Sequence, residues 1–83
     1  MQTTIYLDGR DYADKRAIHA ALKLLLELPE YYGMNADALH DCLTERPDPV
    51  RVCVRAAGES PAADTLDLIR RVVEDAGGEW VDL

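Results

Sequence analysis

The order of short strand-like and longer helix-like segments constrains the fold of this chain more than any other feature. Residues 3–7 are rich in β-branched and aromatic side chains, residues 50–55 alternate valine with arginine or cysteine, and residues 79–82 form a third short strand-like segment. Helical connections separate the three segments, and strands joined in this way pair in parallel with right-handed crossovers. We therefore expect an α/β fold in which a three-stranded parallel sheet is flanked by helices.

Apolar residues spaced three and four apart predict helices at about 14–27, 35–45 and 62–76. Pro29 is expected to end the first helix, because the residue before a proline is pushed out of the helical region. Asn35 is expected to cap the second helix by accepting a hydrogen bond from a free backbone N–H group. The expected order is strand, helix, helix, strand, helix, strand. A short loop that contains Pro29 separates the first two helices.

The length of 83 residues fits one domain that spans 1–83. Apolar residues make up 48% of the chain, which excludes a disordered acidic tail because such a tail has too little to bury. No apolar run approaches the roughly 20 residues that a membrane span needs. The first residues also lack the basic and apolar blocks of a secretion signal. We therefore expect a cytoplasmic protein that does not bind membranes.

The chain is acidic, with 9 basic and 16 acidic residues and a formal net charge of −7. This charge repels nucleic acids and attracts basic partners. Cys42 and Cys53 are the two cysteines, and without a secretion signal they are expected to be free thiols. Cys42 is expected to be buried on the apolar side of the second helix, where a thiol packs as a small apolar group.

The second helix carries the most informative side chains. Asp37, Asp41 and Glu45 follow one another at intervals of four residues, so that they form one acidic stripe. Two consecutive tyrosines and Gly33 precede the helix. Aromatic residues beside convergent carboxylates indicate a docking surface for a basic protein. The alternative is that the stripe is an ordinary solvated face and that one of the tyrosines belongs to the core.

An enzyme is the alternative to a binding protein. Asp37, His40 and Asp41 have a spacing that could hold a metal ion or form an acid–base set, but a metal site needs a third or fourth ligand and a second shell. The other histidine, His19, is expected to be a hydrogen-bonded packing residue of the first helix. The Cys42 thiol is expected to be inert, and no phosphate-binding loop is present. The sequence therefore predicts neither catalysis nor a cofactor or metal.

The run from residue 28 to residue 44 resembles the barstar family of intracellular inhibitors of bacterial ribonucleases. It reads LPEYYGMNADALHDCLT. The resemblance implies the parallel three-stranded fold and a helix that enters the active-site cleft of a ribonuclease together with the loop before it. By position it assigns partner contacts to Tyr31, Gly33, Asn35, Asp37, Asp41 and Thr44. His40 and Glu45 accompany these residues on the same helix and complete the predicted site.

Within this resemblance, Asp41 matches the family's dominant aspartate, whose carboxylate occupies a phosphate subsite of the enzyme. A ribonuclease cleft presents cationic side chains to a phosphodiester, and a rigid carboxylate can replace that phosphate through charge-assisted hydrogen bonds. Tyr31 can close over the cleft and add apolar burial. The resemblance thus implies a basic bacterial ribonuclease as the partner of a monomeric inhibitor.

The chain differs from the family pattern at His40, Glu45, Arg46 and Arg71. Arg46 and Arg71 are expected to oppose a basic enzyme. The differences at His40, Glu45 and Arg46 favour an alternative partner for the same module, namely a different basic protein such as a nuclease toxin.

Overall fold

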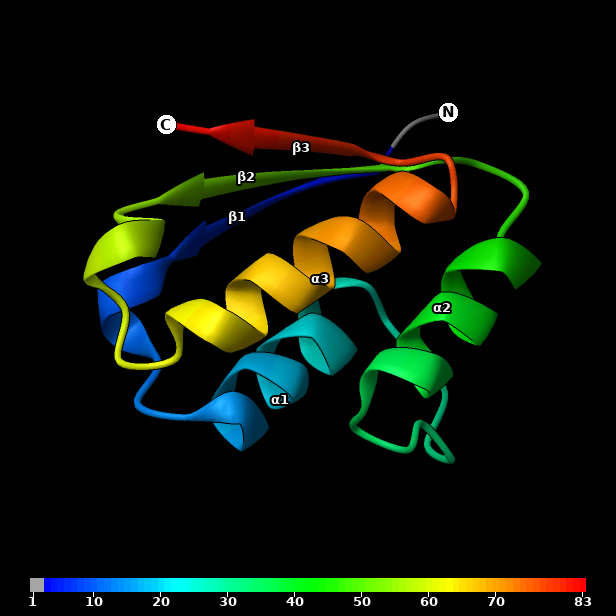
Figure 1. The fold of residues 1–83 in the computed structure, drawn as a ribbon. Helices are drawn as coiled ribbons and strands as arrows, with labels where there is room; N and C mark the ends of the chain where they lie inside the picture. The colour runs from blue at the N-terminus through cyan, green and yellow to red at the C-terminus, as the bar shows by residue number, and fades with distance from the viewer. Residues whose placement is uncertain (1–2) are drawn as a thin grey trace.

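The computed structural model describes residues 3–83, in which three parallel strands are packed against three helices (Figure 1). The strands are β1 (Thr3–Asp8), β2 (Val50–Arg55) and β3 (Glu79–Asp82), and they lie side by side in that order. The helices are α1 (Lys15–Leu25), α2 (Ala36–Glu45) and α3 (Ala63–Asp75). The predicted α/β fold with a three-stranded parallel sheet is confirmed.

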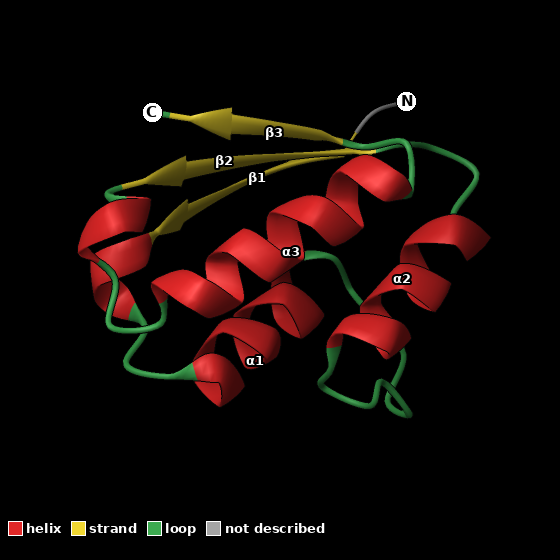
Figure 2. Ribbon diagram, in the orientation of Figure 1, coloured by secondary structure: helices red, strands yellow, loops and turns green. Residues whose placement is uncertain are grey.

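Short 3-10 turns, Gly9–Asp11 and Ala57–Glu59, follow β1 and β2 and lie together at one end of the sheet (Figure 2). Gly9 is required there by a close approach, since a Cβ atom at this position would lie 2.6 Å from the carbonyl oxygen of Ala56. The α2 helix lies at the opposite end of the molecule (Figure 1). None of the helices in residues 3–83 has the length and apolar character needed to cross a membrane.

The three helices lie on the same side of the sheet (Figure 1). Between them and the sheet is a core to which β1, β2 and the three helices contribute branched side chains, and its members with the lowest exposure include Ile18, Leu22, Leu39, Val52, Leu66 and Ile69. From β3, the partly buried Trp80 packs against this core. Full burial of one such side chain contributes about 1.5–3 kcal/mol to folding. Since α2 contributes Leu39 and Leu43 to this core, its opposite face is left to solvent.

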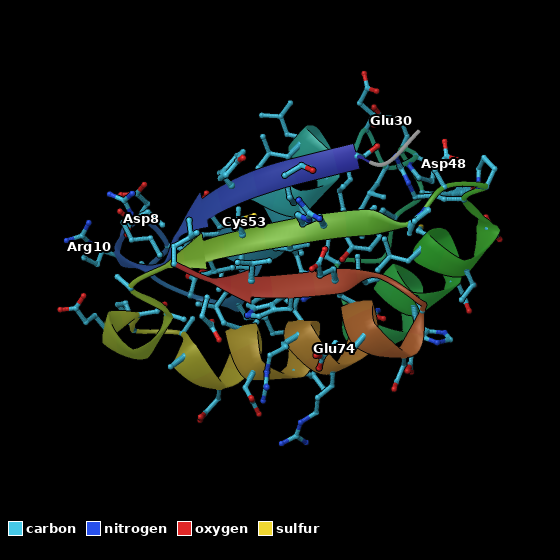
Figure 3. The ribbon with its side chains drawn as sticks, turned by 90° about the horizontal axis from the view of Figure 1, so that it is seen from above. Asp8, Arg10, Glu30, Asp48, Cys53 and Glu74 are labelled. Carbon is cyan, nitrogen blue, oxygen red and sulfur yellow. The ribbon has the colours of Figure 1, made fainter. Side chains whose placement is uncertain are left out.

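The other face of the sheet carries no helix within residues 3–83, and Figure 3 looks directly onto it. Cys53 nevertheless lies buried on this face, in the middle strand, with Tyr6 and Val81 beside it in the register. Both cysteines are free thiols, as predicted. The prediction that Cys42 is buried is wrong, because Leu39 and Leu43 occupy the centre of the apolar face of α2 and Cys42 lies at its margin, half-buried.

The α1 helix ends at Leu25, before Leu28, the residue whose conformation Pro29 restricts. Glu27 adopts a left-handed conformation with φ of 53°. The N–H of Leu28 then donates to the carbonyl of Lys23 at 2.9 Å, and the N–H of Glu27 donates to the carbonyl of Leu24 at 3.3 Å. These two bonds form a Schellman motif, which usually places glycine where this chain has Glu27. The same motif ends α3, where Gly77 has φ of 86°.

Candidate functional site

The N-terminus of α2 is joined to the loop before it by the side chain of Asn35. Its Oδ1 accepts a hydrogen bond from the N–H of Ala38 at 2.8 Å, as the predicted helix cap requires. Its Nδ2 donates to the carbonyl oxygen of Gly33 at 3.1 Å. A Cβ atom on Gly33 would lie 3.2 Å from Asn35 Nδ2, so a larger residue would crowd this contact. Asn35 therefore fixes the loop and the helix relative to each other.

The two tyrosines of the loop have opposite environments. Tyr31 is 73% exposed, whereas Tyr32 is 6% exposed and belongs to the core. The Tyr32 hydroxyl is hydrogen bonded to Nδ1 of His19 on α1, and the N–H of Tyr32 donates to the carbonyl of Pro29 at 3.0 Å. The predicted role of His19 as a hydrogen-bonded packing residue is therefore confirmed. Since Tyr32 is held inside, Tyr31 is directed to the surface.

Burial perturbs both members of this pair. It raises the pKa of Tyr32 to about 12 and lowers the pKa of His19, because each charged form would lose its hydration. Nearby Lys15 lowers the pKa of His19 further. The interior bond therefore joins a neutral phenol and a neutral imidazole near neutral pH.

The outward face of α2 brings together the predicted acidic stripe. Asp37, Asp41 and Glu45 are exposed, and within residues 3–83 their carboxylates have no hydrogen-bond or salt-bridge partner. Thr44 is also exposed, and its hydroxyl donates to the backbone carbonyl of Asp41 at 3.0 Å. His40 is half-buried beside them. The stripe is thus a set of solvated, uncompensated negative charges on a short, capped helix.

The acidic face does not enclose a cavity. Asp37, His40 and Asp41 line none of the main pockets found in residues 3–83. A pocket of about 440 Å³ lies between the C-terminal ends of α2 and α3, and Thr44 is the one predicted site residue that lines it. No group of three or more histidine, cysteine, aspartate or glutamate side chains in residues 3–83 could hold a metal ion. An exposed face of this kind suits docking to another protein better than enclosed catalysis.

The Cys42 thiol offers no nucleophile to this face. Partial burial raises its pKa, and the charges of Glu45 and Asp41 raise it further. A thiol under these influences stays protonated near neutral pH, whereas a reactive cysteine needs a lowered pKa.

Arg46 is bonded within the protein, whereas the sequence predicts that it opposes a basic partner. Its guanidinium is directed inward, where Nη1 donates to the carbonyl oxygen of Leu26 at 2.9 Å and Nη2 donates to Thr3 Oγ1 at 3.2 Å. Arg71, the other cation expected to oppose a partner, lies on α3 and is paired with Asp67 at 2.9 Å. The sequence contained no local signal for the role of Arg46, because its acceptors are 20 and 43 residues away.

Comparisons with known proteins identify the family of this chain. A family model described as Barstar (barnase inhibitor) matches residues 2–83. A protein of Bacillus subtilis (strain 168) named "Putative ribonuclease inhibitor YrdF" is 37% identical over 83 residues, and the alignment covers 92% of this chain and 91% of the relative. Both matches extend over nearly the whole length. The chain belongs to the barstar family.

Proposed function

We propose that this protein inhibits a basic bacterial ribonuclease by placing the acidic face of α2 and the preceding loop in the active-site cleft of the enzyme. Membership of a family described as barnase inhibitors, and a relative named as a ribonuclease inhibitor, support the general role. The observation that carries the mechanism is the exposed Asp41 carboxylate, which has no partner within residues 3–83 and projects from a helix capped at its N-terminus. The proposed contact residues are Tyr31, Gly33, Asn35, Asp37, His40, Asp41, Thr44 and Glu45.

The proposed chemistry is the replacement of a substrate phosphate by the Asp41 carboxylate. Ribonuclease active sites hold cationic side chains arranged for a phosphodiester, and charge-assisted hydrogen bonds to a carboxylate are short and strong. Asp37 and Glu45 extend the negative charge along the helix on either side of Asp41. The fixed helix keeps these groups in place before binding, so that little conformational entropy is lost in the complex.

The exposed loop supplies the apolar part of the proposed contact. Tyr31 presents most of its ring to solvent, and a tyrosine buries a large area at low cost in side-chain entropy. Its neighbour Tyr32 is bonded inside the protein, which limits the conformations available to the loop. Tyr31 would therefore close over the rim of the cleft while the carboxylates of α2 occupy its floor.

The net charge of −7 supports rapid association with a basic enzyme, because long-range attraction between opposite charges raises the rate of encounter. The proposal requires neither metal nor cofactor and assigns the protein no catalysis. We propose that it acts as a monomer in the cytoplasm.

A different basic protein, such as a nuclease toxin, is the alternative partner for the same surface. The differences from the family pattern at His40, Glu45 and Arg46 favour this alternative. Arg46 no longer supports it, because its guanidinium is bonded to other parts of the same chain. His40 and Glu45 remain on the docking face and could select another enzyme.

The test is a titration of barnase with the protein, with cleavage of a fluorogenic RNA oligonucleotide as the readout and a colicin-type deoxyribonuclease assayed in parallel. We expect stoichiometric inhibition of the ribonuclease and none of the deoxyribonuclease. Inhibition of the deoxyribonuclease alone would transfer the function to the alternative partner. Full activity of both enzymes at micromolar concentrations of the protein would contradict both proposals.

A further inference from the structure

Arg46 joins three elements that are distant in the sequence. It follows α2 directly and lies half-buried. Its guanidinium donates to the carbonyl oxygen of Leu26 at the end of α1 and to the hydroxyl of Thr3 in β1, at 2.9 and 3.2 Å. Its own N–H donates to the carbonyl of Leu43 in the last turn of α2 at 3.3 Å. One side chain therefore connects the C-terminal end of the acidic helix to α1 and to the sheet.

The Leu26 carbonyl is a suitable acceptor for a cation. The last carbonyls of a helix have no partner inside the helix and carry partial negative charge. In the Schellman motif of α1, the carbonyls of Lys23 and Leu24 are already bonded to the turn, and Arg46 takes that of Leu26. A planar guanidinium reaches two acceptors at once, which the single ammonium of lysine does less well. The charged guanidinium of Arg46 therefore binds acceptors of its own chain.

The two ends of α2 are held by different contacts. The N-terminal end is fixed by the Asn35 side chain, whereas Arg46 adopts an extended backbone conformation with φ of −75° and ψ of 138° at the C-terminal end. The helix has ten residues, and its buried side chains are Leu39 and Leu43. Asp41 and Thr44 lie within the last five residues before Arg46, so the position of that end sets the position of these two side chains.

We propose that Arg46 is a positioning residue of the inhibitory surface, which fixes the C-terminal half of α2 and thereby the direction of the Asp41 carboxylate. This inference rests on the proposed function. If Arg46 only repelled a basic enzyme, replacing it with a neutral residue would strengthen inhibition. If Arg46 positions Asp41, the same replacement weakens inhibition.

The test compares Arg46→Gln with Arg71→Gln, because each substitution changes the net charge from −7 to −8. We expect Arg46→Gln to weaken inhibition of barnase about tenfold or more, as loss of hydrogen bonds from a charged group implies. Arg71→Gln is expected to leave inhibition unchanged or slightly stronger. Arg46→Lys, which keeps the charge and loses the fork, is expected to lie between wild type and Arg46→Gln. Stronger inhibition by Arg46→Gln would overturn the proposal.

A second arm separates positioning from general stability. In the Asp41→Ala background, Arg46→Gln is expected to cost little further inhibition, because the carboxylate that it positions is absent. An equal loss in both backgrounds would assign Arg46 a purely structural role and overturn the proposal.

A third arm needs no partner enzyme. In free Arg46→Gln, we expect the backbone amides of residues 43–45 to exchange with solvent at least tenfold faster, while those of β2 change much less. Unchanged exchange at 43–45 would contradict the inference. If exchange at 43–45 is faster but the wild-type protein does not inhibit barnase, the structural role of Arg46 is supported and the proposed function is contradicted.

Discussion

The Tyr32 hydroxyl is hydrogen bonded to Nδ1 of His19 in the interior, so the loop before α2 is tied to α1. The two rings lie at an interplanar angle of 47° with centroids 5.9 Å apart. This bond accounts for the different exposure of two consecutive tyrosines, because Tyr32 is held inside and Tyr31 is left at the surface. The interior polar pair is therefore part of the construction of the proposed binding surface.

Removal of the Tyr32 hydroxyl tests the value of this bond. Tyr32→Phe leaves a buried imidazole nitrogen without its partner, which costs about 1–3 kcal/mol. Tyr31→Phe is the matched control, since exposed substitutions stay within about 0.5 kcal/mol. Urea unfolding of both variants measures the two free energies of unfolding. Equal effects of the two substitutions would show that the interior bond contributes nothing.

The stability of the protein is expected to fall with acidification through the titration of His19. Burial lowers its pKa in the folded state, so the unfolded chain binds a proton more readily than the native one. The free energy of unfolding therefore decreases as pH falls below the unfolded value of about 6.5 and continues to decrease down to the folded pKa. Unfolding curves between pH 5 and 8 measure this slope. His19→Gln should reduce the slope in this range, and an unchanged slope would assign it to other groups.

Glu27 occupies a left-handed position that favours glycine. Glu27→Gly should raise the free energy of unfolding by about 1 kcal/mol, because left-handed conformation strains a residue that has a Cβ atom. For a domain of this size, 1 kcal/mol corresponds to a rise in Tm of roughly 4–8 °C. Glu27→Ala removes the same charge and keeps the Cβ atom. Thermal melts that give the same Tm for both variants would attribute any gain to charge.

The fold was predictable because each strand and helix has a local sequence pattern that indicates it. Residues 50–55 alternate along the strand and the apolar positions of α1 follow helical spacing, so the parallel order required no distant information. The inward role of Arg46 was not predictable, because it depends on a carbonyl and a hydroxyl supplied by other elements. The same limit applies to Tyr31 and Tyr32. The sequence does not show which of the two is buried, because that depends on the hydrogen bond between Tyr32 and His19 on another element.

Cys53 and the end of α1 illustrate two further limits. The outward position of Cys53 follows from alternation, but its burial depends on the neighbouring strands on the bare side of the sheet. The helix end depends on the left-handed conformation of Glu27, which propensity alone does not favour.

Association with a basic ribonuclease should slow as salt rises. The attraction expected from a net charge of −7 is screened over about 8 Å at physiological ionic strength and over shorter distances at higher salt. Stopped-flow mixing with barnase between 0.05 and 1 M salt, conditions that span roughly a fourfold change in screening length, measures the rate. A rate independent of salt would indicate a contact that does not rely on charge.

The most direct test of the inhibitory mechanism is a paired measurement on Asp41→Ala and Asp11→Ala. Both residues are exposed aspartates, and Asp11 lies in the short turn after β1 at the end of the molecule away from α2 (Figure 1). In a complex, truncation of Asp41 would leave partner cations buried and unpaired, at a cost of about 2–5 kcal/mol in binding free energy. Complexes of barstar are among the examples from which the energies of such charge pairs are known.

Thermal melting and inhibition of barnase are measured for wild type and for both variants. We expect Asp41→Ala to keep the Tm of the wild type and to weaken inhibition at least tens-fold, while Asp11→Ala changes neither. Equal losses of inhibition from the two variants would show that only net charge matters, and would contradict the replacement of a phosphate by the Asp41 carboxylate.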